Sequence, residues 1–128
     1  MKDQLAMVAE FHKHFRIPAR AELTALIPEA AMRHKIMREE NDEYRDACAA
    51  GDLVAIADAL GDQLYVLCGT IISHGLQDDM VAVFAEIHRS NMSKLGVDGQ
   101  PIIRADGKIL KGEAYFPPNL VAILAPQN

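Results

Sequence analysis

The sequence has few cysteines and no surplus of positive charge. Cys48 and Cys68 are its only two cysteines, and their spacing is not that of metal ligands. Both lie in apolar segments with helical spacing, so we expect buried thiols in a reducing compartment and no disulfide framework. The formal net charge of −5 gives no general reason to expect nucleic-acid binding.

Long apolar runs are also missing. We expect no segment to be long enough to span a bilayer, and Glu10 and His12 interrupt the N-terminal segment in a way that does not fit a signal peptide. Half of the 128 residues are hydrophobic, which argues against disorder and is enough to bury a core. We therefore expect one soluble, cytoplasmic domain over residues 1–128, with no membrane or nucleic-acid partner.

Apolar residues recur at helical spacing in four stretches, which predict helices over about 2–15, 28–50, 53–74 and 80–92. Pro18 ends the first stretch, and Pro28 suits the first turn of the second. Gly51 is a C-terminal stop, and Asp52 is an N-cap for the third helix. These stretches predict an all-α protein with a four-helix bundle core.

The chain changes character after Lys94, where glycine and proline break any helical pattern. Residues 102–110 predict a short hairpin around the turn Asp106-Gly107, and residues 118–124 predict a final short helix. Positive charge gathers in this irregular tail, at Arg104, Lys108 and Lys111.

Two pairs of acidic residues interrupt the apolar stripes of the second and third predicted helices. Glu40 and Glu43 are three residues apart and share one helix face, and Asp58 and Asp62 are four apart on the next helix. In an antiparallel helix pair joined at Gly51 the four positions come level. Unpaired carboxylates do not stabilise a protein interior, so we expect a divalent cation to meet them there.

Four oxygen ligands suit Mg²⁺, with Mn²⁺ as a substitute, and do not suit zinc. Magnesium shares its coordination sphere with substrate phosphates, and it lowers the pKa of a bound water that can attack phosphorus. Glu39 is adjacent and is placed to orient or deprotonate that water. For Glu40 and Glu43 alone, a solvated helix face paired with Arg38 or Lys35 would be the better interpretation, and the second acidic pair reverses it.

These motifs resemble a known group of enzymes. Glu39-Glu40-x-x-Glu43, followed by Asp58-Ala-Leu-Gly-Asp62-Gln-Leu-Tyr65, is similar to the all-α NTP pyrophosphohydrolases. These are the MazG-like and dimeric dUTPase-like enzymes, with phosphoribosyl-ATP pyrophosphohydrolase as a relative. The segments 88–94, 106–111 and 115–118 resemble the C-terminal signature of small single-domain members. The usual third motif is Glu-x-x-Asp, and Ala59 occupies its Glu position here.

The resemblance implies Mg²⁺-dependent hydrolysis of a nucleoside triphosphate to a monophosphate and pyrophosphate. It implies metal ligands at Glu40, Glu43 and Asp62, with Asp58 as a substitute for the missing glutamate, and catalytic roles for Glu39 and Glu40. It also implies a homo-oligomer, either a dimer or a dimer of dimers. The implied substrate contacts are Tyr65, Asn91, Lys94, Arg104, Lys108, Lys111 and Tyr115.

Two other functions fit the residues without the resemblance. One is a non-catalytic helical module that senses a metal or a nucleotide, and the other is an oligomeric scaffold. A scaffold would be indifferent to Mg²⁺ in a melting experiment, whereas a sensing module would be stabilised without forming product.

Overall fold

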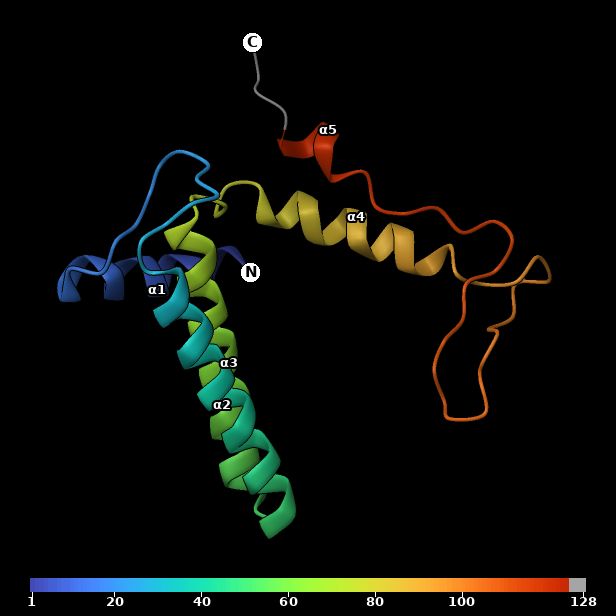
Figure 1. Cartoon of the computed structure of the whole chain (residues 1–128), viewed down its shortest axis with the longest axis horizontal. Coiled ribbons are helices and arrows are strands. Elements are labelled where there is room, and N and C mark those ends of the chain that lie inside the picture. Colours follow the sequence, from blue (N-terminus) through green and yellow to red (C-terminus); the bar gives the residue numbers. More distant parts are fainter. Residues whose placement is uncertain (125–128) are drawn as a thin grey trace. The chain divides into compact units, whose positions relative to one another are not determined.

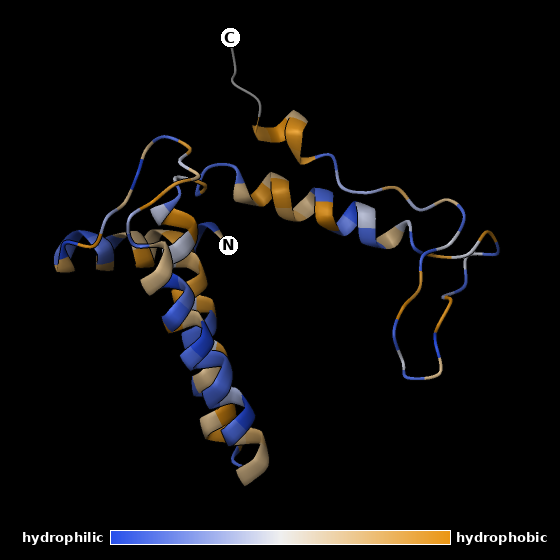
Figure 2. Cartoon of the chain, viewed as in Figure 1, coloured by the Kyte–Doolittle hydropathy of each residue, from blue (hydrophilic) through white to orange (hydrophobic). Residues whose placement is uncertain are grey.

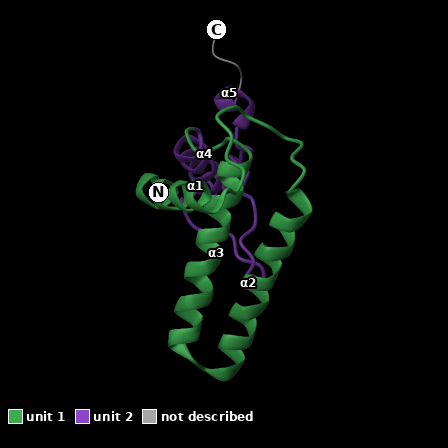
Figure 3. Cartoon of the chain, turned by 90° about the vertical axis from the view of Figure 1, so that its left-hand side faces the viewer, with its two compact units in different colours: residues 1–78 green, residues 79–128 purple. Residues whose placement is uncertain are grey.

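The computed structural model describes residues 1–124 and is helical, with no regular strand in that range (Figure 1). The all-α prediction is confirmed. The chain divides into two compact units, residues 1–78 and residues 79–128 (Figure 3). The fourth helix belongs to the second unit, so the four-helix bundle and the single domain stay predictions. The helices are α1 (Lys2–Phe15), α2 (Ala30–Ala50), α3 (Leu53–Ser73), α4 (Met80–Met92) and α5 (Leu120–Leu124).

The first unit is built on an antiparallel hairpin of α2 and α3, two helices of 21 residues each (Figure 3). Gly51 ends α2 in the left-handed conformation with φ 66°, and the Asp52 side chain accepts a hydrogen bond from the Ala55 N–H at 3.1 Å. Both turn residues thus act as the sequence predicts. α2 begins at Ala30 because Pro28 and Glu29 form a turn before it.

α1 packs across α3 near the C-terminal end of α3. Leu5, Val8 and His12 are its buried residues, and Cys68 and Ile72 of α3 are buried as well. Residues 16–29 then cross the end of α3. The Arg20 N–H donates to the Ile72 carbonyl at 3.2 Å and the Thr24 N–H donates to the His74 carbonyl at 2.9 Å. These hydrogen bonds therefore attach the connection to the C-terminal end of α3.

Several apolar residues that the helical pattern assigns to a core are exposed. Leu53 is 77% exposed and Leu64 is 51% exposed, and Leu60 and Leu67 are each about half exposed. Figure 2 shows apolar residues along α3, whereas α2 is mainly hydrophilic. Periodicity identifies the apolar face of a helix, but it does not say whether the same chain covers that face.

The prediction of two buried thiols is half wrong. Cys68 is buried, and burial raises the pKa of its thiol. Cys48, on α2, is exposed.

The expectation that no segment reaches membrane-spanning length is also wrong. α3 is long and apolar enough to cross a membrane by length and composition. Its most apolar stretch has a mean hydropathy of 1.3, and 28% of that stretch is buried. Length and composition are properties that a helix of a soluble protein can share with a membrane span. Asp58 and Asp62 also place two carboxylates within α3, which is costly in lipid.

The second unit consists of α4 and a tail that returns along it. The buried Ser90 hydroxyl donates to the Phe116 carbonyl at 2.8 Å, and the Phe116 N–H donates to the Ser93 hydroxyl at 3.1 Å. Glu86 accepts a hydrogen bond from the Asn119 N–H at 2.8 Å just before α5. These contacts give the irregular tail a defined path.

The predicted hairpin is present, although it pairs at a single antiparallel bridge between Ile103 and Ile109. The Arg104 N–H donates to the Lys108 carbonyl at 2.8 Å, and Gly107 takes φ 89° at the turn. The predicted turn at Asp106-Gly107 is therefore confirmed.

Candidate functional site

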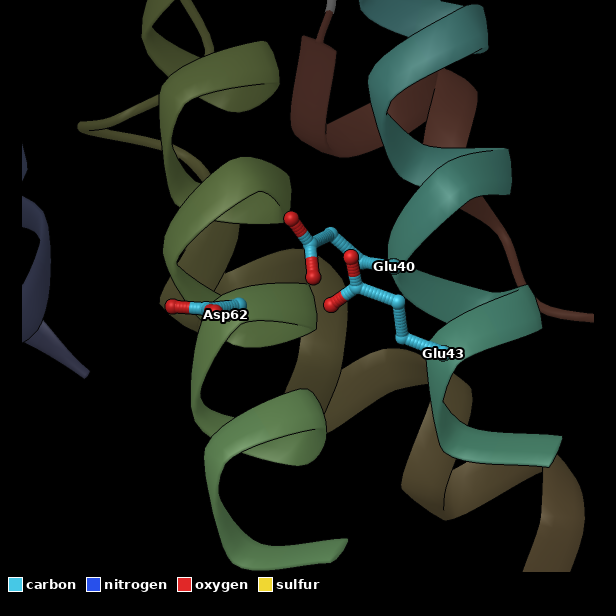
Figure 4. Close-up of side chains that lie close together, drawn as sticks. All are labelled: Glu40, Glu43 and Asp62. Atoms are coloured by element: carbon cyan, nitrogen blue, oxygen red, sulfur yellow. The ribbon is translucent and has the colours of Figure 1, made fainter. Parts of the chain in front are cut away.

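Three of the predicted acidic residues converge between α2 and α3. Glu40 and Glu43 lie one helical turn apart on α2, and Asp62 lies on α3 (Figure 4). One carboxylate oxygen from each residue can be chosen so that all three lie within 4.8 Å of one another. Glu40 and Asp62 are half-buried and Glu43 is exposed, so the cluster opens toward solvent on one side. We call these three residues the acidic cluster.

Glu40 is the member of the acidic cluster whose environment disfavours the charged form. Its Oε2 atom is buried and has no hydrogen-bond partner within residues 1–124. The pKa of Glu40 is raised, chiefly by desolvation and then by the Glu43 carboxyl and the charges of Asp62 and Asp58. A carboxylate that loses water and faces like charges is stabilised either by a proton or by a nearby cation. The cluster therefore has the oxygen donors and the excess negative charge that are typical of a divalent metal site.

An amide bridge joins the two helices beside the acidic cluster. The Gln63 Nε2 atom donates to Asn41 Oδ1 at 3.0 Å, and each residue is the sequence neighbour of a cluster acid. Sequence reasoning missed this pair. The signal for it was present, since two amides adjacent to two acidic motifs that come level are able to pair across the helices.

The other predicted ligands lie at the margin of the acidic cluster. Asp58 is exposed and is not one of the three, although its charge contributes to the raised pKa of Glu40. Ala59 is buried, at 2% exposure. A glutamate at position 59, as in the usual motif, would thus lie in the interface between the helices. Asp58 is exposed and does not lie there. Whether Asp58 ligates the ion stays a prediction.

Glu39 is exposed on α2, and one of its carboxylate oxygens lies 4.0 Å from the Lys35 ammonium nitrogen. Its carboxylate is therefore accessible to solvent. Tyr65 of α3 is partly exposed, and its ring meets the Phe11 ring edge-on at 5.5 Å between centroids.

The remaining predicted substrate contacts belong to the second unit. Arg104 pairs with Asp106 across the hairpin turn, and its Nε donates to Asp106 Oδ1 at 2.8 Å. The Lys111 ammonium lies 4.7 Å from the centre of the Tyr115 ring. The exposed residues among these contacts are Asn91, Arg104, Lys108 and Lys111, while Lys94 and Tyr115 are half-buried.

The raised pKa of Glu40 predicts a pH-dependent stability in the metal-free chain. The folded state holds this proton more tightly than the unfolded chain, so Glu40 contributes stability below its ordinary pKa of 4.5. That contribution is lost as the pH rises through the raised value. We expect Glu40→Gln to melt at a higher temperature than the wild type at pH 7 in EDTA, with the two curves converging toward pH 4.

Thermal melts from pH 4 to pH 8 measure this difference. Glu39→Gln is the matched control, because Glu39 is the exposed neighbour on the same helix. It is expected to follow the wild type. A gap between Glu40→Gln and the wild type that stays constant with pH would contradict the assignment.

A helical hairpin that gathers carboxylate oxygens around a place for a divalent cation is suited to breaking phosphoanhydride bonds. The architecture is thus the one that the sequence resemblance implies, that of the all-α pyrophosphohydrolases. The family model of phosphoribosyl-ATP pyrophosphohydrolase matches residues 8–91, and the chain belongs to this family. Its members are pyrophosphohydrolases that act on phosphoanhydride bonds. A search of curated proteins finds no match.

The matched range includes the second half of α1, from Val8, the acidic cluster and nearly all of α4. It ends at Asn91, so Lys94 and the basic residues of the tail lie outside it. The family membership therefore bears on the helical hairpin and its acids, and the predicted roles of the tail rest on the sequence resemblance.

Proposed function

We propose that the chain is a Mg²⁺-dependent nucleoside triphosphate pyrophosphohydrolase, which releases a nucleoside monophosphate and pyrophosphate. The acidic cluster is the observation that carries the proposal. Its three oxygens lie within 4.8 Å of one another, and a buried Glu40 oxygen has no hydrogen-bond partner among the described residues, 1–124. All of its donors are carboxylate oxygens, the type that Mg²⁺ and Mn²⁺ prefer.

The residues of the site have distinct roles in this proposal. Glu40, Glu43 and Asp62 hold the ion, and Asp58 adds negative charge at the edge. When bound, Mg²⁺ neutralises phosphate oxygens and lowers the pKa of a coordinated water. Glu39, exposed beside the cluster, accepts the proton of the attacking water as a general base, assisted by Glu40.

We assign binding of the substrate to Tyr65 and to polar residues of the second unit. Cationic side chains there neutralise the charge of a triphosphate, and an aromatic ring offers a stacking surface. The assigned residues are Asn91, Lys94, Arg104, Lys108, Lys111 and Tyr115.

Incubation with a panel of nucleoside and deoxynucleoside triphosphates, with phosphoribosyl-ATP included, tests the proposal. With Mg²⁺ we expect pyrophosphate and a monophosphate from at least one triphosphate, and no product in EDTA. Turnover of phosphoribosyl-ATP alone would retain the enzyme class. It would overturn the assignment of ordinary nucleoside triphosphates as substrates. Release of orthophosphate alone, or no turnover of any nucleotide, would refute the whole proposal.

The exposed face of α3 supports a homo-oligomer, a dimer or a dimer of dimers. Leu60, Leu64 and Leu67 follow one another at helical spacing and are each about half exposed. Monomeric soluble proteins rarely leave such a contiguous apolar stripe in water. Light scattering on the purified chain is expected to give two or four times the mass of one copy, and a monomer would contradict this part of the proposal.

A further inference from the structure

Arg33 is a buried arginine in the interface between α2 and α3. It is 7% exposed, and its guanidinium reaches across to α3. Its Nη2 atom donates to the Val66 carbonyl at 2.7 Å and its Nε donates to the Thr70 hydroxyl at 3.1 Å. Within residues 1–124 no carboxylate forms an ion pair with it, and burial lowers its pKa. A buried charge without a carboxylate partner is costly, so its position requires an explanation.

The neighbouring residues are shaped to receive this guanidinium. Gly69 of α3 has no side chain, and a Cβ added there would lie 2.4 Å from Arg33 Nη2 and 2.9 Å from His12 Nε2. His12 of α1 is itself buried and faces the Pro18 carbonyl through Nδ1 at 3.1 Å. The Arg33 side chain therefore occupies a space that only glycine leaves open, at the point where three helices meet.

The position of this contact relative to the acidic cluster is informative. Arg33 precedes Glu40 by seven residues, which is close to two helical turns and places both on one face of α2. Val66 follows Asp62 by four residues, about one turn along α3. A contact at Arg33 therefore fixes how far α2 is shifted along α3, and how closely it approaches, next to the acids.

Nearer to the acids, small side chains and a surface hydrogen bond join the two helices. Ala47 and Ala59 are buried there but are small, and the Asn41–Gln63 bridge is exposed to competing water. The carboxylates repel one another before an ion binds. A rigid attachment within one to two turns is needed to keep them at ligating distance.

We propose that Arg33 is a positioning residue for the metal site. Its two hydrogen bonds to α3 hold the two helices at the register in which Glu40, Glu43 and Asp62 meet on one ion. The inference rests on the proposed function, because it assumes that the acidic cluster binds a divalent cation.

Arg33 acts through geometry and not through its charge. Seven residues of helix separate it from Glu40 by about 10 Å along the axis. The charges that shift the pKa of Glu40 are those of Glu43, Asp62 and Asp58. Lysine keeps the charge but lacks the planar fork that reaches two acceptors at once. Arg33→Lys therefore separates the two explanations.

The test is the dissociation constant for Mn²⁺, measured by electron paramagnetic resonance on the full chain well below its melting temperature. We expect Arg33→Lys to weaken Mn²⁺ binding by about tenfold, the scale seen when groups that support metal ligands are replaced. Arg45→Lys is the matched control, because Arg45 is exposed on the same helix, and it is expected to leave the constant unchanged. With excess Mn²⁺, kcat of Arg33→Lys should recover.

Thr70→Val is a milder second variant that removes one of the two acceptors of Arg33, and we expect it to weaken Mn²⁺ binding severalfold. If Arg33→Lys does not fold, Thr70→Val decides the question. Variants that melt lower but bind Mn²⁺ like the wild type would overturn the inference and leave the proposed function standing. A wild-type chain that binds no Mn²⁺ would overturn both.

Discussion

Replacing Glu43 by glutamine, or Asp62 by asparagine, is expected to lower pyrophosphate release by about a thousandfold or more. Each change keeps the shape of the side chain and removes one charged ligand from the acidic cluster. A bound ion contributes several kcal/mol of transition-state stabilisation, and each 1.36 kcal/mol corresponds to about tenfold in rate. Loss of about 4 kcal/mol gives the expected factor.

The fold should survive these two changes. Without metal, each variant is expected to melt at or above the temperature of the wild type, because one member of a repelling set has been neutralised. Added Mg²⁺ should stabilise the wild type and have little effect on the variants. Circular dichroism, melting curves and a pyrophosphate assay on the same samples measure all three quantities.

Asp46→Asn is the control for these measurements. Asp46 lies on the same helix, is 70% exposed and pairs with Arg45 outside the acidic cluster. Its loss is expected to leave both turnover and the Mg²⁺ response unchanged. If Glu43→Gln and Asp62→Asn retained the turnover of the wild type, the acidic cluster would not be the metal site.

Gly75→Ala is expected to destabilise the first unit more than Gly51→Ala does. Gly75 takes φ +73°, and a Cβ would lie 2.1 Å from the Glu22 carbonyl oxygen and 2.7 Å from the Glu22 carbonyl carbon. The Glu22 backbone cannot retreat easily, because hydrogen bonds from Arg20 and Thr24 tie it to the end of α3 on both sides. The expected loss of unfolding free energy is about 2–5 kcal/mol, combining left-handed strain with overpacking.

Gly51→Ala is a closely matched control. Gly51 takes φ +66° in the same unit, and a Cβ there would meet nothing within 4 Å. Only the conformational cost remains, about 1–2 kcal/mol. Since 1 kcal/mol shifts the melting temperature of a domain of this size by about 4–8 °C, melting curves separate the two variants clearly. Equal shifts would show that the contact with Glu22 is not rigid.

Helical spacing alone was enough to predict the acidic cluster. Three or four residues along a helix return to one face, so the two acidic motifs had to face a common side once Gly51 joined their helices. The spacing could not separate Asp58 from Asp62. A four-residue step turns by about 40° beyond a full circle, so the two side chains point in slightly different directions. The packing of α2 against α3 decides which of the two joins the acidic cluster.

Other features depend on packing that no single segment contains. Arg33 was missed because an arginine on a helix usually extends into water, and its burial depends on the missing side chain of Gly69 on another helix. Cys48 and Leu64 were expected to be buried because they are apolar and lie at helical spacing, but they are exposed. Apolar periodicity identifies a face that avoids water, and only the tertiary structure shows whether that face is covered by the same chain.

The α2–α3 hairpin also limits how the chain can change in length. The two helices are connected covalently at Gly51 and are held together again at Arg33, with the carboxylates midway between these attachments. One added or deleted residue on either helix between them would rotate every following side chain by about 100° and separate the ligands. Insertions and deletions compatible with activity should therefore fall outside residues 33–70.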